Sequence, residues 1–369
     1  MASASNIGAV ERVAGALYGA LIADALAMPA HWVYRTGLMP QLFGADGITG
    51  FRAPPERLPG SILSLSSTSG GGRGKDDGGL VGDVILHGKR KYWARGADYH
   101  YHVSLAAGEP TLEGQLLTVL AGCAAGDGSR SDSGQVEGLE AWAEDAASAG
   151  SGLAERFREA YVAFMTTPGS HNDTYAATAH RMFFANHVLD GVPAVEAADD
   201  DRHNVAAIDA LTLPTLPMVL ACVAAGGGGG GRAGDPGRVP EAAVEAGMAV
   251  LGVTRNVPYI RPYVAAYGQL LWLTLNGVAP SAAAASVACD EPFAGRFDLP
   301  AFAALHGPGR EPMAACYIDG AFRVLLYLLY AYGDDADVSV ALLANANAGG
   351  ENVARGSCLG AVLGAWWTG

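Results

Sequence analysis

The chain has 369 residues, of which 50% are hydrophobic and 16% are charged. This apolar content suffices for a large buried core and excludes global disorder. The formal net charge of −14 at pH 7 opposes binding to a phosphate backbone, and the short basic–aromatic patch at residues 88–93 is too small to form a nucleic-acid groove. We therefore expect no nucleic-acid partner.

The cysteine spacing and the hydropathy of the chain indicate in which cellular compartment the protein is expected. The five cysteines are widely spaced and none lies in a C-x-x-C pattern, so they are interpreted as reduced core thiols. The first residues show no basic leader followed by a long apolar stretch. The apolar run at residues 325–332 is too short to cross a bilayer. We expect a cytoplasmic protein with no membrane partner.

Apolar residues recur at three- and four-residue spacing along most of the chain, which predicts helices. The predicted helices are 8–28, 112–125, 151–166, 174–189, 205–225, 239–252, 258–277, 312–332, 336–346 and 352–366. Alternation with a period of two is scarce, so we expect an all-α fold, a compact single-domain helical bundle over residues 1–369. Residues 38–103 are rich in Gly, Pro and Ser and predict an irregular insertion whose later part packs over a site.

The first chemically suggestive segment is the apolar stretch at residues 15–32. Asp24 lies inside it, and a buried carboxylate is costly unless it is hydrogen-bonded or paired. His31 follows seven residues later and can share a helical face with Asp24, although Pro29 distorts the turn between them. Two interpretations stay open: a site, or a buried aspartate that caps a neighbouring loop with a histidine at the rim.

The second segment, residues 99–115, clusters side-chain oxygens at the start of a predicted helix. Glu109, Thr111 and Glu113 can hold a hard cation such as Mg²⁺, or Thr111 can simply cap the free helix amides. His100 and His102 lie nearby. They do not predict zinc, because no further His or Cys lies at ligand spacing.

The third segment, residues 170–184, combines His171 and Asp173 before a predicted helix. Ser170 or Asp173 can cap that helix, and capping explains part of the pattern without any chemistry. It does not explain His171. A polar helix mouth also suits a ligand rim, because the free amides favour anionic groups.

The fourth segment, residues 345–365, places the glycine pair Gly349 and Gly350 directly before a helix of small residues. Paired glycines allow a backbone to approach a ligand closely, which predicts that this turn and Asn352 contact one. The helix itself has glycines four residues apart at 356, 360 and 364. That spacing is typical of a close-packing face.

In this order, the four segments resemble the ADP-ribosylglycohydrolase superfamily. Its N-terminal helix reads Gly-Asp-Ala-Leu-Gly followed by Pro, and residues 19–29 are similar. Its C-terminal motif reads Asn-x-Gly-Gly-Asp-Thr-Asp-Thr, and residues 347–354 occupy that place as Asn-Ala-Gly-Gly-Glu-Asn-Val-Ala. Phrases at residues 27–32, 101–112, 173–184 and 349–353 look closest to the crystallin-J and selenoprotein J branch.

The resemblance implies a metal site that has largely been lost. Catalytic members hold two Mg²⁺ ions with a Thr-Asp-Asp triplet and with Asp, Asp and Thr of the C-terminal motif. The corresponding positions here are Thr111, Leu112, Glu113, Glu351, Val353 and Ala354. The three apolar side chains offer no oxygen to a hard cation. At most one Mg²⁺ is expected, held by Thr111, Glu113 and Glu351.

The resemblance also implies a hydrolase, a glycosidase that hydrolyses or binds an ADP-ribose-like, N- or O-ribosyl compound in a polar cleft. The expected partner is a small nucleotide-like ligand. The catalytic candidates are the carboxylates Asp24, Glu109, Glu113 and Glu351, because glycosidic cleavage needs positioned carboxylates or a metal. The ligand-binding candidates are His31, His100, His102, His171, Asp173, Gly349, Gly350 and Asn352. The alternative is a catalytically inactive ligand-binding protein or a crystallin-like structural relative.

Overall fold

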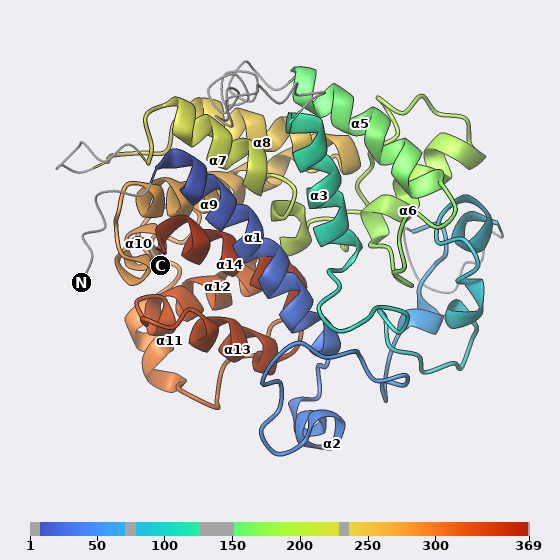
Figure 1. Ribbon diagram of the computed structural model, residues 1–369, viewed down its shortest axis with the longest axis horizontal. Helices are drawn as coiled ribbons and strands as arrows, with labels where there is room; N and C mark the ends of the chain where they lie inside the picture. Colours follow the sequence, from blue (N-terminus) through green and yellow to red (C-terminus); the bar gives the residue numbers. More distant parts are fainter. Residues whose placement is uncertain (1–7, 71–78, 126–150, 229–235, 368–369) are drawn as a thin grey trace, which may run out of the picture.

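The computed structural model describes residues 8–70, 79–125, 151–228 and 236–367 (Figure 1). Within these ranges the chain is helical, and its β-type pairing is limited to isolated bridges. The predicted all-α fold is confirmed.

Thirteen labelled α-helices occur in the described ranges: α1 Ala9–Ala27, α2 Met39–Phe43, α3 Leu112–Ala125, α5 Ser151–Thr166, α6 Thr178–Phe184, α7 Thr215–Ala224, α8 Glu241–Thr254, α9 Arg261–Leu275, α10 Pro280–Ala288, α11 Leu299–Leu305, α12 Ile318–Tyr332, α13 Ser339–Ala348 and α14 Val353–Trp366. Short 3₁₀ turns lie at Met28–Ala30, Thr36–Leu38, Leu63–Leu65, Arg90–Trp93, Ile208–Leu211 and Pro258–Ile260. Turns with π-type hydrogen bonds lie at Leu80–Val84 and Ala185–Leu189.

The predicted helix boundaries differ from the observed ones mainly beside the irregular segments. The helix predicted at 174–189 begins only at Thr178, and the one predicted at 312–332 begins at Ile318. Helices α10 and α11 were not predicted. Each begins with a proline in its first turn, and Asp298 caps α11 by accepting from the amide of Ala301.

Helices α1 and α14 lie side by side at the centre of the molecule (Figure 1). Their backbones touch, because a Cβ atom built on Gly19 would lie 2.1 Å from the carbonyl oxygen of Gly360, and one built on Gly360 would lie 2.0 Å from that of Gly19. A Cβ on Gly15 would similarly meet the carbonyl of Gly364. The pairing is therefore antiparallel, and it brings the end of α1 to the turn that precedes α14.

Residues 9–30 are long and apolar enough to pass a length-and-hydropathy test for a membrane span. More than half of their most apolar window is buried inside the protein. Packing along α14 accounts for that apolar composition, as expected for the core helix of a helical domain.

The described part of the insertion at 38–103 is mostly irregular and packs against the segment before α6. The indole Nε1 of Trp93 donates to the carbonyl of Thr174 at 2.9 Å. The hydroxyl of Tyr101 accepts from the amide of Ile62 at 2.9 Å. Ile62 and Ser66, from the earlier part of the insertion, line a cavity, and so does His102 from the later part, which was predicted to pack over a site.

We predict that Gly360→Ala lowers the free energy of unfolding by about 2–3 kcal/mol or more, because its methyl group would overlap the α1 backbone. The matched control is Gly252→Ala on the exposed face of α8, where a Cβ meets nothing within 4 Å. The control should gain about 0.5–1 kcal/mol of stability. Chemical denaturation measures both variants. Equal stability of Gly360→Ala and wild type would contradict backbone contact between α1 and α14.

Candidate functional site

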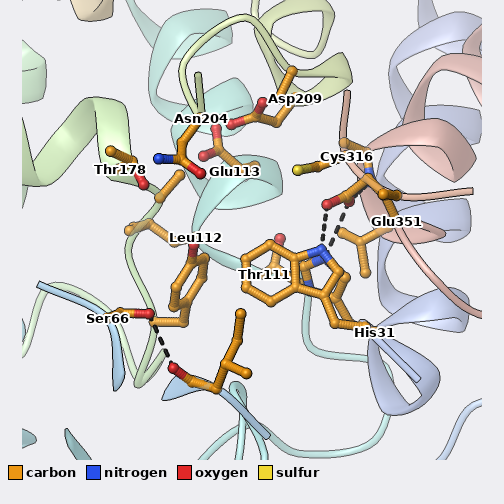
Figure 2. A pocket seen from close by; sticks show the side chains of 18 of the residues that line it. His31, Ser66, Thr111, Leu112, Glu113, Thr178, Asn204, Asp209, Cys316 and Glu351 are labelled. Atoms are coloured by element: carbon orange, nitrogen blue, oxygen red, sulfur yellow. Dashed lines mark hydrogen bonds and ion pairs between the residues drawn. The ribbon is translucent and has the colours of Figure 1, made fainter. Parts of the chain in front are cut away.

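A cavity of about 490 Å³ lies where the four sequence segments meet (Figure 2). Its lining includes His31 after α1, Thr111 and Glu113 at the start of α3, Asp173 before α6 and Glu351 before α14. Small-molecule sites typically occupy ~300–1,000 Å³. The cavity is therefore large enough for a small ligand and is surrounded by titratable groups.

Glu351 is a buried carboxylate held by three donors. Its Oε1 lies 3.0 Å from Nε2 of His31 and accepts from the amide of Ala354 at 3.3 Å. Its Oε2 accepts from Nε1 of Trp32 at 2.6 Å. Burial raises the pKa of Glu351, but His31 and the other donors outweigh burial, and the pKa is lowered. Glu351 is therefore an ionised carboxylate with a fixed orientation.

The rings of His31 and His102 lie edge to edge with their planes 9° apart, and they join Glu351 to Asp173. The Nδ1 of His31 lies 2.6 Å from Nε2 of His102, and Nδ1 of His102 lies 2.8 Å from Oδ1 of Asp173. Asp173 also accepts from the amides of Leu112 and Tyr175. Burial raises the pKa of Asp173, but these donors, with His102 first, lower it overall.

Asp24 and Asp173 cap the start of α3 from outside that helix. The amide of Thr111 donates to Oδ1 of Asp24 at 2.6 Å, and its hydroxyl donates to Oδ2 at 2.8 Å. Of the two roles considered for Thr111, helix capping by its hydroxyl is not observed among the described residues, because the hydroxyl donates to Asp24. Asp24 is fully buried, and burial raises its pKa to about 7. It does not line the cavity.

Glu113 and Asp209 lie together at one end of the cavity (Figure 2). Oε1 of Glu113 lies 2.8 Å from Nε2 of the buried His180. Burial raises the pKa of Glu113, but His180 and Arg255 outweigh it and the pKa is lowered. Burial, with the nearby charges of Glu113 and Glu351, raises the pKa of Asp209 to about 6 despite the opposing effect of Arg255.

Arg255 is the buried cation behind Asp209, with its Nη1 3.1 Å from Oδ1 of that residue. Burial opposes the charge of Arg255, but Asp209 and Glu113 outweigh burial, and the pKa of Arg255 is raised. Asp209 and Arg255 were not identified from the sequence. Asp209 carries the same signal that singled out Asp24, an acidic residue in an apolar stretch, here residues 205–213.

Gly349 and Gly350 lie outside the cavity lining and pack against backbone carbonyls beside the site. Both have left-handed φ angles, 65° and 63°. A Cβ on Gly349 would meet the carbonyl of Val33, and one on Gly350 would meet the carbonyl of Ala314. Trp32 has φ 60°, a strained value for a side chain of this size, and its amide donates to the Gly350 carbonyl at 2.8 Å. The glycine turn thus fixes Trp32 against Glu351.

The other predicted site residues lie outside the cavity lining. Glu109 is partly exposed and accepts from the amide of Ala106. Asn352 is buried and donates to the carbonyls of Ala27 and Ala346. His100 is buried behind His102, and burial lowers its pKa well below the usual value. The ring of His171 stacks on Phe164, 5.7 Å away.

The predicted metal ligands Thr111, Glu113 and Glu351 line the cavity, and most of their side-chain oxygens have protein partners. The hydroxyl of Thr111 is donated to Asp24, and both oxygens of Glu351 accept from nitrogen donors. Leu112, Val353 and Ala354 contribute no side-chain oxygen. Among the described residues, no group of three or more His, Cys, Asp or Glu side chains could hold a metal ion.

Comparison with known proteins gives a family. A family model described as ADP-ribosylglycohydrolase matches residues 5–368. A solved structure titled "ADP-ribosylglycohydrolase-related protein complex" is similar, with 15% sequence identity and a TM-score of 0.48 over 98% of this chain and 88% of that chain. A search of curated proteins gives no match.

We predict that Asp24→Asn removes a pH dependence from stability. The raised pKa means that the folded state keeps the Asp24 proton to higher pH than the unfolded chain. The stability that the protonated Asp24 contributes is therefore fully present below the pKa of Asp24 in the unfolded chain, near 4. It is lost as pH rises through the pKa of Asp24 in the folded state, about 7. Relative to wild type, Asp24→Asn should gain roughly 2–4 kcal/mol between pH 4 and pH 8.

Chemical denaturation at a series of pH values measures this difference, and the exposed Asp290→Asn serves as the control. A constant difference between Asp24→Asn and wild type across that range would show that Asp24 is ionised throughout.

Proposed function

We propose that this chain, which belongs to the ADP-ribosylglycohydrolase family, binds an ADP-ribose-like compound in the cavity and hydrolyses its N- or O-ribosyl bond. The observation that carries the proposal is that one cavity gathers residues from all four segments of the family-like pattern. If the four segments lay far apart in the fold, they could not form one site. The phrases shared with the crystallin-J and selenoprotein J branch support placing the chain in that branch.

Glycosidic hydrolysis needs a group that protonates the leaving group and a base that takes a proton from water. Two neighbouring carboxylates whose pKa values are shifted in opposite directions suit these roles. The pKa of Asp209 is raised to about 6, while that of Glu113 is lowered. We assign Asp209 as the acid and Glu113 as the base. Water then supplies the hydroxyl to the ribose carbon, and its proton goes to Glu113.

Glu351 is the third carboxylate in this assignment. It lies across the cavity from Glu113 and Asp209, on the side of His31 (Figure 2). Three hydrogen bonds fix its charge in place, so it can stabilise positive charge on the ribosyl group as the bond breaks. Asp24 and Glu109, outside the cavity lining, take no part in these steps.

Arg181 is the candidate partner for an anionic group of the ligand, such as a phosphate. It lines the cavity, is 3% exposed, and its guanidinium packs on the ring of Trp93. Its Nε and Nη2 donate to Ala176 and Thr178, whereas Nη1 has no hydrogen-bond partner among the described residues. A buried donor without a partner is costly, and a bound anion would satisfy it.

We further propose that the reaction runs without the two Mg²⁺ ions of the catalytic members. The support is the chemistry of the side chains at the corresponding positions, three of which are apolar. The carboxylates are paired instead with nitrogen groups of the protein: His31 lies beside Glu351, His180 beside Glu113 and Arg255 beside Asp209.

The same missing oxygen ligands favour a second candidate, a catalytically inactive protein that keeps the ligand-binding cavity or serves a structural role. Binding and hydrolysis must therefore be measured separately.

We predict that ADP-ribose binds with the same affinity in Mg²⁺ and in chelator, measured by isothermal titration calorimetry. Glu351→Gln should bind ADP-ribose with an affinity close to that of wild type but slow hydrolysis about 10²-fold, because its fixed charge acts on positive charge that develops only as the bond breaks. Glu109→Gln is the matched control and should bind as wild type. Affinity that depends on Mg²⁺ would contradict the metal-free site, and absence of binding in both buffers would contradict the proposed ligand class.

We predict that Asp209→Asn lowers the rate of hydrolysis of ADP-ribosylated substrates about 10²–10⁴-fold, with binding retained, because a general acid contributes this much. The acid must be protonated, so the wild-type rate should fall as pH rises through about 6. A rate profile of wild type and variant tests both statements. Unchanged hydrolysis by Asp209→Asn would remove it from the mechanism, and absence of hydrolysis with intact binding would favour the inactive candidate.

A further inference from the structure

The opening of the cavity is built from aromatic rings. Among the described residues that line the cavity, the exposed ones are Tyr34, His203 and Tyr317, and each carries a ring. Tyr34 is 38% exposed and Tyr317 is 46% exposed. The other lining residues, including Asp209 and Arg181, are buried or half-buried. Because the exposed lining residues are those nearest to solvent, these three rings surround the entrance, and we call them the aromatic mouth.

Hydrogen bonds hold two of the three rings in place. Oδ1 of Asp201 accepts from the amide of His203 at 3.0 Å and from the next two amides along the chain. The amide of Ile208 donates to the carbonyl of Cys316 at 2.9 Å, which joins the segment of His203 to the segment of Tyr317. The phenol oxygen of Tyr317 lies 3.1 Å from Nε2 of His203. A ligand that binds here meets rings that are already positioned, so little side-chain entropy is lost on binding.

The aromatic mouth lies above the gap between two of the cavity carboxylates. Figure 2 shows the side chain of Cys316 between those of Asp209 and Glu351. Burial, followed by the charges of Glu351 and Asp209, raises the pKa of the Cys316 thiol to about 12, which places the thiol near both carboxylates. Tyr317 directly follows Cys316 in the chain. Burial is also the main cause that raises the pKa of Tyr34, and Glu351 and Cys316 add to it. A group held by these rings therefore faces the carboxylates below.

Ring faces recognise one chemical class better than others. Aromatic side chains bind flat rings by stacking or by edge-to-face contact, and every nucleobase offers a flat face for such contact. Ribose and phosphate groups are recognised by hydrogen bonds, which the face of a ring does not provide. In the proposed function Asp209 is the acid, so the part of the ligand beside Asp209 is the leaving group. Tyr317 belongs to the segment that pairs with the chain just before Asp209.

We propose that the aromatic mouth binds the leaving group and that this leaving group is a planar nitrogen heterocycle of the nucleobase type. This inference rests on the proposed function and narrows its substrate to an N-ribosyl compound of the nucleotide class. The ribose then lies inside the cavity, and its phosphate is the anionic group for Arg181. Tyr34, His203 and Tyr317 are specificity-determining residues, because they select a flat ring over a leaving group without one.

The reaction balances with water as the only co-reactant. The bond between the ribose carbon and the ring nitrogen breaks, and its electron pair goes to the heterocycle. The heterocycle takes the proton of the Asp209 carboxyl group. Water supplies a hydroxyl group to the ribose carbon and its other proton to Glu113. The products are a ribose with a free hydroxyl group and a neutral base, and the base lies at the opening, from which it can leave to solvent.

Calorimetric titration of the full chain with adenosine monophosphate, uridine monophosphate and ribose 5-phosphate tests the ring preference. The Asp209→Asn background keeps hydrolysis from consuming the ligand. Both nucleotides should bind at least about tenfold more tightly than ribose 5-phosphate. Adding Tyr317→Leu should remove this difference and leave the affinity for ribose 5-phosphate unchanged. The control is Tyr330→Leu, an exposed tyrosine outside the cavity lining, which should keep the difference. Equal affinities for all three compounds, or a difference that survives Tyr317→Leu, would overturn the proposal.

Analysis of the products tests whether the ring at the mouth is the leaving group. The wild-type chain should release free base from at least one of the two nucleotides, and Tyr317→Leu should lower kcat/KM for this release about tenfold. Nucleotides that bind through Tyr317 but release no base, while an ADP-ribosylated substrate is hydrolysed, would overturn the leaving-group assignment and leave the proposed function standing. Absence of binding by ADP-ribose and by all three compounds would contradict the proposed function and this inference together.

Discussion

Backbone contact between α1 and α14 is the constraint on which the site depends. Glycines on both helices allow the chains to approach until carbonyl oxygens occupy the space that Cβ atoms would need. The antiparallel pairing then fixes the relative position of the two helix ends. Because His31 and Trp32 follow the end of α1 while α14 begins just after Glu351, this packing brings His31 and Glu351, 320 residues apart in sequence, within one hydrogen bond.

Buried carboxylates then determine the chemistry. Ionised side chains are costly in a protein interior unless each has a partner. In the described lining, Glu351 and Asp173 are paired through two imidazoles, Glu113 is paired with His180, and Asp209 with Arg255. The partners are nitrogen groups of the protein itself. In the proposed function, these nitrogen groups take the place of the metal ions.

The sequence predicts the helical fold well because helix periodicity is a local signal. Helices α3 and α5 begin and end where the pattern places them. Recognition of the four segments likewise placed His31, His102, Glu113 and Glu351 at one site. Partners across the fold were not predictable: His180 and Arg255 are paired with carboxylates on other elements, and no spacing along the chain encodes such contacts.

Two further differences between the sequence analysis and the structure have causes of the same kind. Gly349 and Gly350 have the conformational freedom that a ligand-contacting turn requires, but backbone packing uses it. Thr111 has the composition of a helix cap, but Asp24, distant in sequence, accepts its hydroxyl. In both cases the local sequence pattern predicted the backbone geometry but not which distant residue would contact it.

The central claim is that a ribosyl ligand occupies this cavity without metal ions. The most direct measurement is a crystal structure of the protein grown with ADP-ribose and Mn²⁺, with anomalous scattering used to locate the metal. The account predicts the ribose between Glu351 and the Glu113–Asp209 pair, with no anomalous peak at Thr111, Glu113 or Glu351. A manganese ion bound by these side chains, or ADP-ribose bound outside the cavity, would contradict it.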